Sequence, residues 1–208
     1  MGHSAGGHLA LLYAYMSAEG TTVIDPDSDT EQYFTLSPVQ LVIYEAGPIQ
    51  FATSNNALFT DNFICAMAGI NPNTANGVGL SALVDASPYC VAQGLQDKST
   101  LPYTILAYGK GIISATGEDG DGLVPIKPAL DLYNSQTDSQ KTLEDLGNNS
   151  GCLSSPDNNC VFYYFYEVGH TQFGIGQNKK VYPNPQIDND DLKAAINDYY
   201  GDIKDFMT

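Results

Sequence analysis

The chain has 208 residues, of which 43% are hydrophobic and 15% are charged, and its formal net charge at pH 7 is −16. This composition indicates one globular domain with its own core and argues against a disordered chain. The acidic balance argues against a nucleic acid or an anionic membrane as partner, because both attract cationic surfaces. No run of about 18 apolar residues occurs, so no membrane span is expected.

The four cysteines leave their redox state open. Cys65, Cys90, Cys152 and Cys160 include no CxxC pair, so a zinc or redox site is not expected. Cys152 and Cys160 bracket a polar loop that a disulfide could close, and free buried thiols are the alternative. The even cysteine count and the few lysines lean towards an exported protein, although no signal peptide is visible.

The first third of the chain is predicted to contain a helix, a loop and a strand. Residues 6–18 have apolar side chains at helical spacing, and Gly20 can end the helix. The polar segment 20–37 is expected to be a surface loop. Residues 39–46 form a short apolar run of the kind found in buried parallel strands, and Gly47 with the following proline stops it.

The middle of the chain is predicted to continue the alternation of helices and strands. Residues 57–68 and 77–86 are candidate helices, and residues 102–108 form the second predicted strand. An acidic, glycine-rich loop is expected over residues 111–122. Residues 125–135 are predicted to be a helix, because the proline at its start suits the first helical turn.

The last third contains a loop, a strand and a long amphipathic helix. Residues 147–159 are predicted to be loop, residues 161–168 a strand rich in Tyr and Phe, and residues 189–206 a helix capped by Asp188. Helices and strands therefore alternate along the whole chain. This order predicts an α/β fold, with parallel sheet strands flanked by helices, in a single domain over residues 1–208.

The strongest chemical signal is the G-x-S-x-G spacing of residues 2–6, which is typical of a nucleophile elbow. In an elbow a serine, here Ser4, sits on a sharp turn between a strand and a helix. Gly2 and Gly6 are expected to remove side chains that would collide in that turn. The backbone N–H of Ala5 is then the candidate oxyanion donor.

A nucleophilic serine needs a base, and three histidines are present. His3 and His8 flank the elbow, and we interpret them as elbow packing or as hydrogen-bonding groups at the start of the helix. His170 directly follows the third predicted strand, and the carboxyl end of a parallel strand is where an active site in this architecture lies. His170 is therefore the candidate base.

The acid that orients the base should come from the loop after the second predicted strand. That loop holds Glu118, Asp119 and Asp121. Asp121 is favoured because it stands just before the next helix, and Asp119 is the alternative acid. A calcium site in this loop is a further alternative, but the loop lacks the full ligand spacing of an EF-hand. The order Ser4, Asp121, His170 is the triad order of the α/β-hydrolase fold.

With these motifs in this order, the sequence resembles the α/β-hydrolase superfamily, in particular its esterase/lipase (carboxylesterase-like) group. The resemblance runs in order along nearly the whole chain. The segments that carry it are Gly-His-Ser-Ala-Gly-Gly-His-Leu-Ala from Gly2, Ser37-Pro38-Val39 through Ala46-Gly47-Pro48, Ala86-Ser87-Pro88, Tyr108-Gly109-Lys110, Asp121-Gly-Leu-Val-Pro125 and Gly169-His170.

The resemblance implies a serine hydrolase that cleaves carboxylic esters through an acyl-enzyme. Ser4 would be the nucleophile, His170 the general base and acid, and Asp121 the orienting residue. It implies a small-molecule ester substrate and neither a metal nor an organic cofactor. A peptidase or amidase uses the same triad, and a catalytically inactive fragment or an interaction protein is the non-enzymatic alternative.

The sequence departs from the family in two places. The loop between Gly109 and Asp121 is longer than expected, which keeps Asp119 open as the acid. The sequence also has no counterpart of the family's N-terminal half, including its His-Gly-Gly oxyanion loop, so it looks like the C-terminal part of the fold, starting at the elbow. A truncation or fragment that needs the missing segment is therefore expected.

Overall fold

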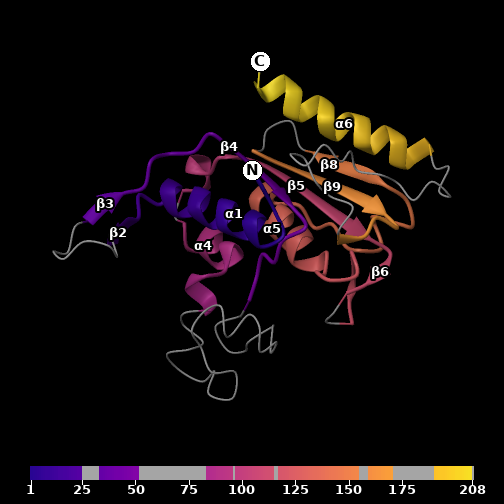
Figure 1. Cartoon of the computed structure of the whole chain (residues 1–208), viewed down its shortest axis with the longest axis horizontal. Helices are drawn as coiled ribbons and strands as arrows, with labels where there is room; N and C mark the ends of the chain where they lie inside the picture. Colours follow the sequence, from indigo (N-terminus) through magenta and orange to yellow (C-terminus); the bar gives the residue numbers. More distant parts are fainter. Residues whose placement is uncertain are drawn as a thin grey trace.

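A central sheet organises the computed structural model, which describes residues 1–24, 33–51, 83–95, 97–114, 117–154, 159–170 and 190–207. Within them the strand order is β1-β4-β5-β9-β8 (Figure 1). Neighbouring strands are parallel except for β8 and β9, which are antiparallel. In sequence order the strands are β1 (Gly2–His3), β4 (Leu41–Glu45), β5 (Tyr103–Lys110), β8 (Gly151–Ser154) and β9 (Cys160–Tyr166).

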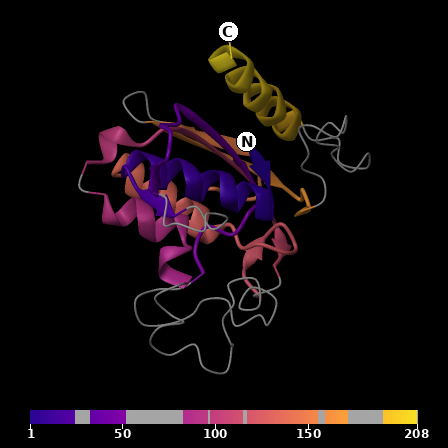
Figure 2. The same ribbon diagram turned by 60° about the vertical axis from the view of Figure 1, so that its left-hand side comes forward.

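Helices cover both faces of this sheet, as Figures 1 and 2 show. One face carries α1 (Ala5–Ala18), α4 (Pro88–Gly94) and α5 (Lys127–Thr137), and the other carries α6 (Asp190–Met207). Strands that are covered on both faces need apolar side chains on both, which explains the nearly continuous apolar sequences of β5 and β9. The predicted fold class, an α/β fold with parallel strands flanked by helices, is confirmed.

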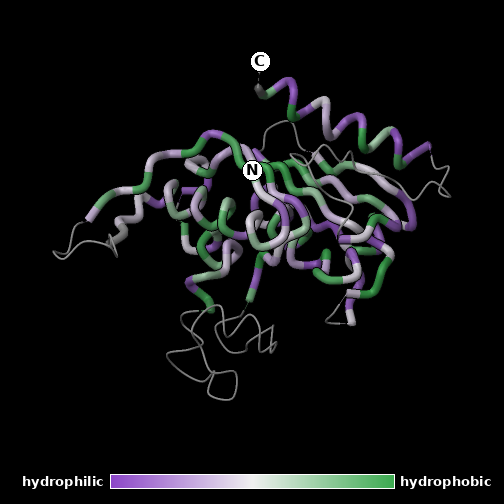
Figure 3. The backbone as a smooth tube through the Cα atoms, in the orientation of Figure 1, coloured by the Kyte–Doolittle hydropathy of each residue, from purple (hydrophilic) through white to green (hydrophobic). Residues whose placement is uncertain are grey.

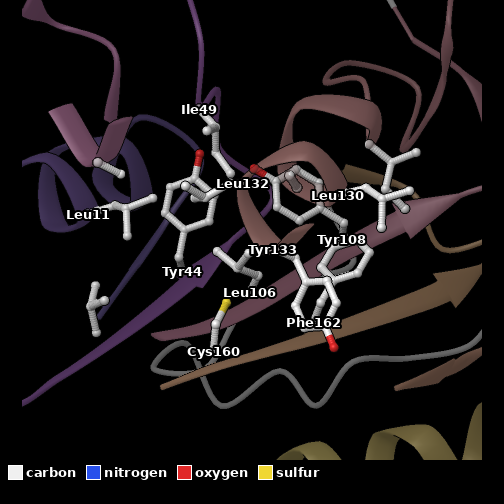
Figure 4. Close-up of a cluster of buried hydrophobic side chains, with 14 of the residues drawn as sticks. Leu11, Tyr44, Ile49, Leu106, Tyr108, Leu130, Leu132, Tyr133, Cys160 and Phe162 are labelled. Atoms are coloured by element: carbon white, nitrogen blue, oxygen red, sulfur yellow. The ribbon is translucent and has the colours of Figure 1, made fainter. Parts of the chain in front are cut away.

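The larger core lies between the sheet and helices α1, α4 and α5. Tyr44, Leu106 and Phe162 project from three neighbouring strands towards these helices and are fully buried (Figure 4). They stand in register across the sheet, Tyr44 beside Leu106 and Leu106 beside Phe162. Because strand side chains alternate, the intervening residues point to the opposite face and form a second core with α6.

Helix α6 is attached by apolar packing and by two tyrosine–carboxylate hydrogen bonds. Hydrophilic and hydrophobic residues alternate along α6, whereas the central strands are mostly hydrophobic (Figure 3). The Tyr199 hydroxyl donates to Glu45 Oε1 over 2.7 Å, and the Tyr163 hydroxyl of β9 donates to Asp202 Oδ2 over 2.5 Å. Burial raises the pKa of Tyr199, so its hydroxyl stays protonated and able to donate. The buried Glu45 carboxylate thereby gains a donor.

The long elements follow the sequence predictions closely. Helix α1 begins at Ala5, one residue before the predicted start at residue 6, and Gly20 follows it with a φ of 71°. The predicted strands at residues 39–46, 102–108 and 161–168 correspond to β4, β5 and β9. The predicted C-terminal helix corresponds to α6, while its candidate cap, Asp188, lies outside the described residues.

The three predicted loops each contain short strands, so these predictions were wrong in detail. The segment 20–37 contains β2 (Thr22–Ile24) and β3 (Tyr33–Thr35), which pair antiparallel. The loop 111–122 contains β6 (Ile112–Ile113) and β7 (Asp119–Gly120), and the loop 147–159 contains β8. Strands of only two to four residues are too short to show the alternation of apolar and polar side chains by which a strand is recognised in a sequence.

The helices around the prolines also start elsewhere than predicted. Helix α5 begins at Lys127, with Pro128 in its first turn, and not at residue 125. Helix α4 and the short 3-10 helix η2 (Lys98–Thr100) were not predicted. The predicted helix 57–68 lies outside the described residues, and of the predicted helix 77–86 only residues 83–86 are described, with 83–85 helical.

The Cys152–Cys160 disulfide, one of two alternatives left by the sequence, does not form in this structure. Cys90, Cys152 and Cys160 are free, and Cys65 lies outside the described residues. Cys152 of β8 lies opposite Tyr163 of β9 in the strand register, and the Tyr163 side chain packs on the α6 face of the sheet. The Cys160 side chain belongs to the core on the other face. Because the two sulfur atoms point to opposite faces of the sheet, they cannot bond without a change of register.

Helices long and apolar enough to cross a membrane are absent from the part of the chain that the structure describes.

We expect Tyr199→Phe to lower the free energy of unfolding by about 1.5–3 kcal/mol, because the buried Glu45 carboxylate loses a charge-assisted hydrogen bond. Chemical denaturation measures this change. Tyr13→Phe is the matched control, because the Tyr13 side chain is 42% exposed. Equal stability of the two variants would contradict the assigned role of this hydrogen bond.

Candidate active site

The elbow residue Ser4 adopts a strained backbone conformation between β1 and α1. Its φ of 55° and ψ of −126° are unusual for a residue with a side chain. The turn is held from both sides: the Ser4 N–H donates to the Glu45 carbonyl over 2.9 Å, and the His8 N–H donates to the Ser4 carbonyl over 3.0 Å. This is the sharp strand-to-helix turn that the G-x-S-x-G spacing predicts.

The glycines of the elbow do not all have the predicted role. A Cβ at Gly2 would lie 2.2 Å from the carbonyl oxygen of Gly6, so this position requires glycine. A Cβ at Gly6 would meet nothing within 4 Å, so the prediction of a collision there was wrong. Gly7, which sequence reasoning did not single out, is tighter, with Gly2 O at 2.9 Å from an added Cβ. The close contact in this turn is therefore between β1 and the start of α1.

The structure brings together the three residues proposed from the sequence as a triad. His170 Nε2 lies 2.9 Å from Ser4 Oγ, and His170 Nδ1 lies 2.7 Å from Asp121 Oδ2. A carboxylate can only accept, so Nδ1 carries the proton when His170 is neutral. Nε2 is then left with a lone pair directed at the Ser4 hydroxyl, which is the arrangement that a general base requires.

The Asp121 carboxylate is held by three hydrogen bonds, and the main-chain carbonyl of the same residue accepts a further one. Its Oδ1 accepts from the N–H groups of Leu123 and Val124 over 2.9 and 2.7 Å, which leaves Oδ2 for the imidazole. The Asp121 carbonyl also accepts from the His170 N–H over 2.8 Å. Asp121 is 2% exposed. Acid and base are thus joined through backbone and side chain at once, which fixes the orientation of the ring.

The alternative acid, Asp119, is paired with a lysine and a backbone N–H of its own loop. Its carboxylate forms a 3.2 Å ion pair with Lys110 Nζ and accepts from the Gly111 N–H over 2.6 Å. Lys110 is buried, so this pairing compensates a charge that would otherwise be costly. The geometry favours Asp121 of the two candidate aspartates: its carboxylate contacts His170, whereas Asp119 contacts Lys110 and Gly111 at the start of the loop that carries Asp121.

Two further glycines, Gly109 and Gly47, allow the loops to approach one another. A Cβ at Gly109 would lie 1.9 Å from the Val168 carbonyl oxygen and 2.7 Å from Asp121 Cβ. A Cβ at Gly47 would lie 2.4 Å from the Ser4 carbonyl oxygen. Glycine at or near the carboxyl end of a parallel strand often marks a close approach of another backbone segment, and this is the signal that could have identified them.

The two remaining histidines have different surroundings. His3 Nε2 lies 2.9 Å from the His170 carbonyl oxygen, and the two rings lie 4.9 Å apart. His8 Nδ1 lies 2.9 Å from the Pro48 carbonyl oxygen, and its ring packs on Phe51 at 4.5 Å. Burial lowers the pKa of both His3 and His8, which favours their neutral forms. His8 therefore joins the elbow helix to the loop after β4, whereas His3 contacts the candidate base.

Ala5 is the first residue of α1, where backbone N–H groups have no partner within the helix. The helix N-terminus also carries a partial positive charge. The Ala5 N–H follows Ser4 directly, as an oxyanion donor must. Within the described ranges, no group of three or more His, Cys, Asp or Glu side chains could hold a metal ion.

Because the space around Gly2 and Gly6 differs, we expect the two positions to differ in their tolerance of alanine. Gly2→Ala should abolish folding or strongly destabilise the elbow, because its Cβ overlaps backbone atoms that cannot move independently. Gly6→Ala should leave the melting temperature unchanged or raised, since alanine favours a helix by about 1 kcal/mol over glycine. Thermal unfolding of both variants checks this, and an equally damaging Gly6→Ala would contradict the geometry.

Comparison with known proteins supports the fold at low sequence similarity. No protein-family model and no curated protein sequence matches the chain. Among solved structures, the Est2 esterase of the planctomycete Thermogutta terrifontis, with butyrate bound, is 14% identical over 99% of this chain and 55% of its own length, with a TM-score of 0.48. The propionate-bound form of the same esterase is 16% identical over 99% of this chain and 54% of its own length, with a TM-score of 0.49.

A bifunctional GH43-CE protein of Bacteroides eggerthii is 18% identical, over 96% of this chain and 21% of its own length, with a TM-score of 0.50. This chain thus spans about half the length of the Est2 structures. At such identities a structural likeness concerns the fold alone, because one fold hosts many functions. What these comparisons add is a likeness of fold to part of the Bacteroides eggerthii protein, in keeping with the mixed α/β architecture and its mostly parallel sheet between helices.

Proposed function

We propose that this protein is a serine hydrolase that cleaves carboxylic esters, with Ser4 as nucleophile, His170 as general base and acid, and Asp121 as orienting acid. The observation that carries the proposal is the continuous chain from Asp121 Oδ2 through the His170 ring to Ser4 Oγ, with heavy-atom distances of 2.7 and 2.9 Å. A serine, a base and its orienter in mutual hydrogen-bond contact make up a nucleophilic site.

In the first half of the proposed reaction, Ser4 Oγ attacks the ester carbonyl carbon and its proton passes to His170 Nε2. The imidazolium that forms is stabilised by Asp121, which stays ionised. The carbonyl oxygen becomes an oxyanion at the N-terminus of α1, where the Ala5 N–H donates to it. His170 Nε2–H then protonates the leaving alcohol oxygen, and the acyl group remains on Ser4.

In the second half, water replaces the alcohol. His170 Nε2 takes a proton from the water, and the resulting hydroxide oxygen attacks the acyl carbon. Collapse of the second oxyanion returns the proton to Ser4 Oγ and releases the carboxylic acid. No redox change or external reactant besides water is needed, and each proton moves between Oγ, Nε2 and the leaving or attacking oxygen.

The proposal includes a second polypeptide segment that completes the oxyanion hole. Ala5 supplies one donor, and loss of one donor typically costs about 2.7–4 kcal/mol of transition-state stabilisation. Among the described strands β1 pairs with β4 alone, so its other edge has no partner among these strands. Helix α1 also exposes apolar side chains, with Leu9 at 64% and Tyr13 at 42%. A segment paired with β1 would bring a second backbone N–H towards Ser4, which directly follows that strand.

The direct test is labelling of the purified chain by a fluorophosphonate, which reacts with activated serines. We expect one adduct at Ser4, located by peptide mass spectrometry, and none in Ser4→Ala. Hydrolysis of short-chain p-nitrophenyl esters should fall on the order of 10⁶-fold in that variant, as for loss of a triad serine. A folded chain that is neither labelled nor active on esters would contradict the proposal.

The same assay separates the alternative chemistries. Equal activity on anilide and ester substrates would favour an amidase or peptidase, because an amine leaves less readily than an alcohol. Labelling of the chain that becomes faster when a β1-pairing peptide is added would support the second segment. Labelling of the chain alone at full rate would show that Ala5 suffices and would remove the need for that segment.

The two aspartates give a second prediction. Asp121→Asn should reduce kcat on the order of 10⁴-fold with little change in stability, because the amide favours the wrong His170 tautomer. Asp119→Asn should lower the free energy of unfolding by about 1–3 kcal/mol, since it leaves the buried Lys110 ammonium without its counter-charge, and should change kcat far less. Steady-state kinetics and denaturation measure both. A larger kcat loss in Asp119→Asn would overturn the assignment.

A further inference from the structure

We propose that His3, the residue before the nucleophile, is a positioning residue that holds the main chain at His170 and thereby the direction of its ring towards Ser4. The inference rests on the proposed hydrolase function and adds a fourth residue to it. His3 does not contact the reacting atoms, so its effect passes through His170.

The geometry places one anchor on each side of the His170 Cα. On the amino side, the His170 N–H donates to the Asp121 carbonyl over 2.8 Å. On the carboxyl side, His3 Nε2 lies 2.9 Å from the His170 carbonyl oxygen and is the donor. Fixing both peptide groups fixes the direction of the Cα–Cβ bond between them. The imidazole is then aimed by the backbone and not only by its own two ring contacts.

The His3 contact also ties the nucleophile to the base without using the bond that reacts. His3 and Ser4 are adjacent, and β1 is held to β4 by the pairing of His3 with Glu45. The Ser4–His170 hydrogen bond is lost while Ser4 carries an acyl group, whereas the His3–His170 contact does not involve the Ser4 hydroxyl. It can therefore keep the base in place for the attack of water.

The charge state of His3 suits this role. Its ring lies 4.9 Å from the His170 ring, tilted by 42°. His170 becomes positively charged during the proposed reaction, so a second cation at this distance would oppose the step. Burial lowers the pKa of His3 and favours the neutral form, although the hydrogen bond to the His170 carbonyl and the nearby Asp121 charge act in the opposite sense. A neutral His3 with its proton on Nε2 donates to the carbonyl and adds no charge.

Three variants of His3 separate the donor from the ring. His3→Gln places an amide N–H near the position of Nε2, His3→Asn carries the same amide one methylene short, and His3→Phe keeps a ring without a donor. The readout is the second-order rate of fluorophosphonate labelling at Ser4. We expect His3→Asn and His3→Phe to slow labelling about tenfold, which is the equivalent of one hydrogen bond. The labelling rate of His3→Gln should stay within about threefold of that of the unmodified chain.

A spectroscopic readout distinguishes positioning from general structural damage. The low-field proton resonance of the His170–Asp121 hydrogen bond should persist in His3→Gln and broaden or shift in His3→Asn, at matched melting temperatures. If His3→Phe fails to fold, comparison of His3→Gln with His3→Asn still tests the role of the donor, because both variants carry the same amide group. Equal labelling rates for Gln and Asn would overturn the role of the donor.

The outcomes for the unmodified chain keep the two proposals apart. Absence of labelling in the folded, unmodified chain contradicts the hydrolase proposal and, with it, the role of His3. Normal labelling of the unmodified chain together with normal labelling of His3→Asn contradicts the positioning role alone. Slow labelling of His3→Asn with recovery in His3→Gln supports both.

Discussion

The proposed triad depends on how closely backbone segments can approach one another at the carboxyl edge of the sheet. Ser4, Asp121 and His170 follow three different strands, and their loops meet only because side chains are missing between them. A Cβ at Gly109 would overlap the Val168 carbonyl oxygen, and one at Gly47 would overlap the Ser4 carbonyl oxygen. The hydrogen-bond distances within the site are therefore set by backbone packing, and the strained φ at Ser4 is maintained by the same contacts.

Electrostatic pairing divides the acidic loop into a supporting part and a part that faces the base. Asp119 neutralises the buried Lys110 through Oδ2 and accepts from the Gly111 N–H through Oδ1, so both of its carboxylate oxygens already have a partner. Asp121 uses Oδ1 for two backbone donors and Oδ2 for His170. A carboxylate that is fully hydrogen-bonded in a buried site keeps one orientation, which is what an orienting acid requires.

The long elements and the three candidate residues could be predicted from the sequence, because each has a local signal. Helical spacing marks α1 and α6, apolar runs mark β4, β5 and β9, and the elbow motif marks Ser4. The short β6–β7 and β8 pairings have no such signal, because their stability comes from neighbours distant in sequence. The same holds for His3: its adjacency to Ser4 was visible, but its contact with the His170 carbonyl depends on two strands meeting in three dimensions.

The sheet also links the site to its opposite face through one residue. Glu45 ends β4, and its carbonyl accepts from the Ser4 N–H, while its side chain accepts from Tyr199 of α6. Its register partner on β1 is His3. Glu45 therefore joins the docking contact of α6, the backbone turn at Ser4 and the proposed positioning residue His3 within a single residue of β4. Because packed interiors have low compressibility, the positions of these three contacts constrain one another.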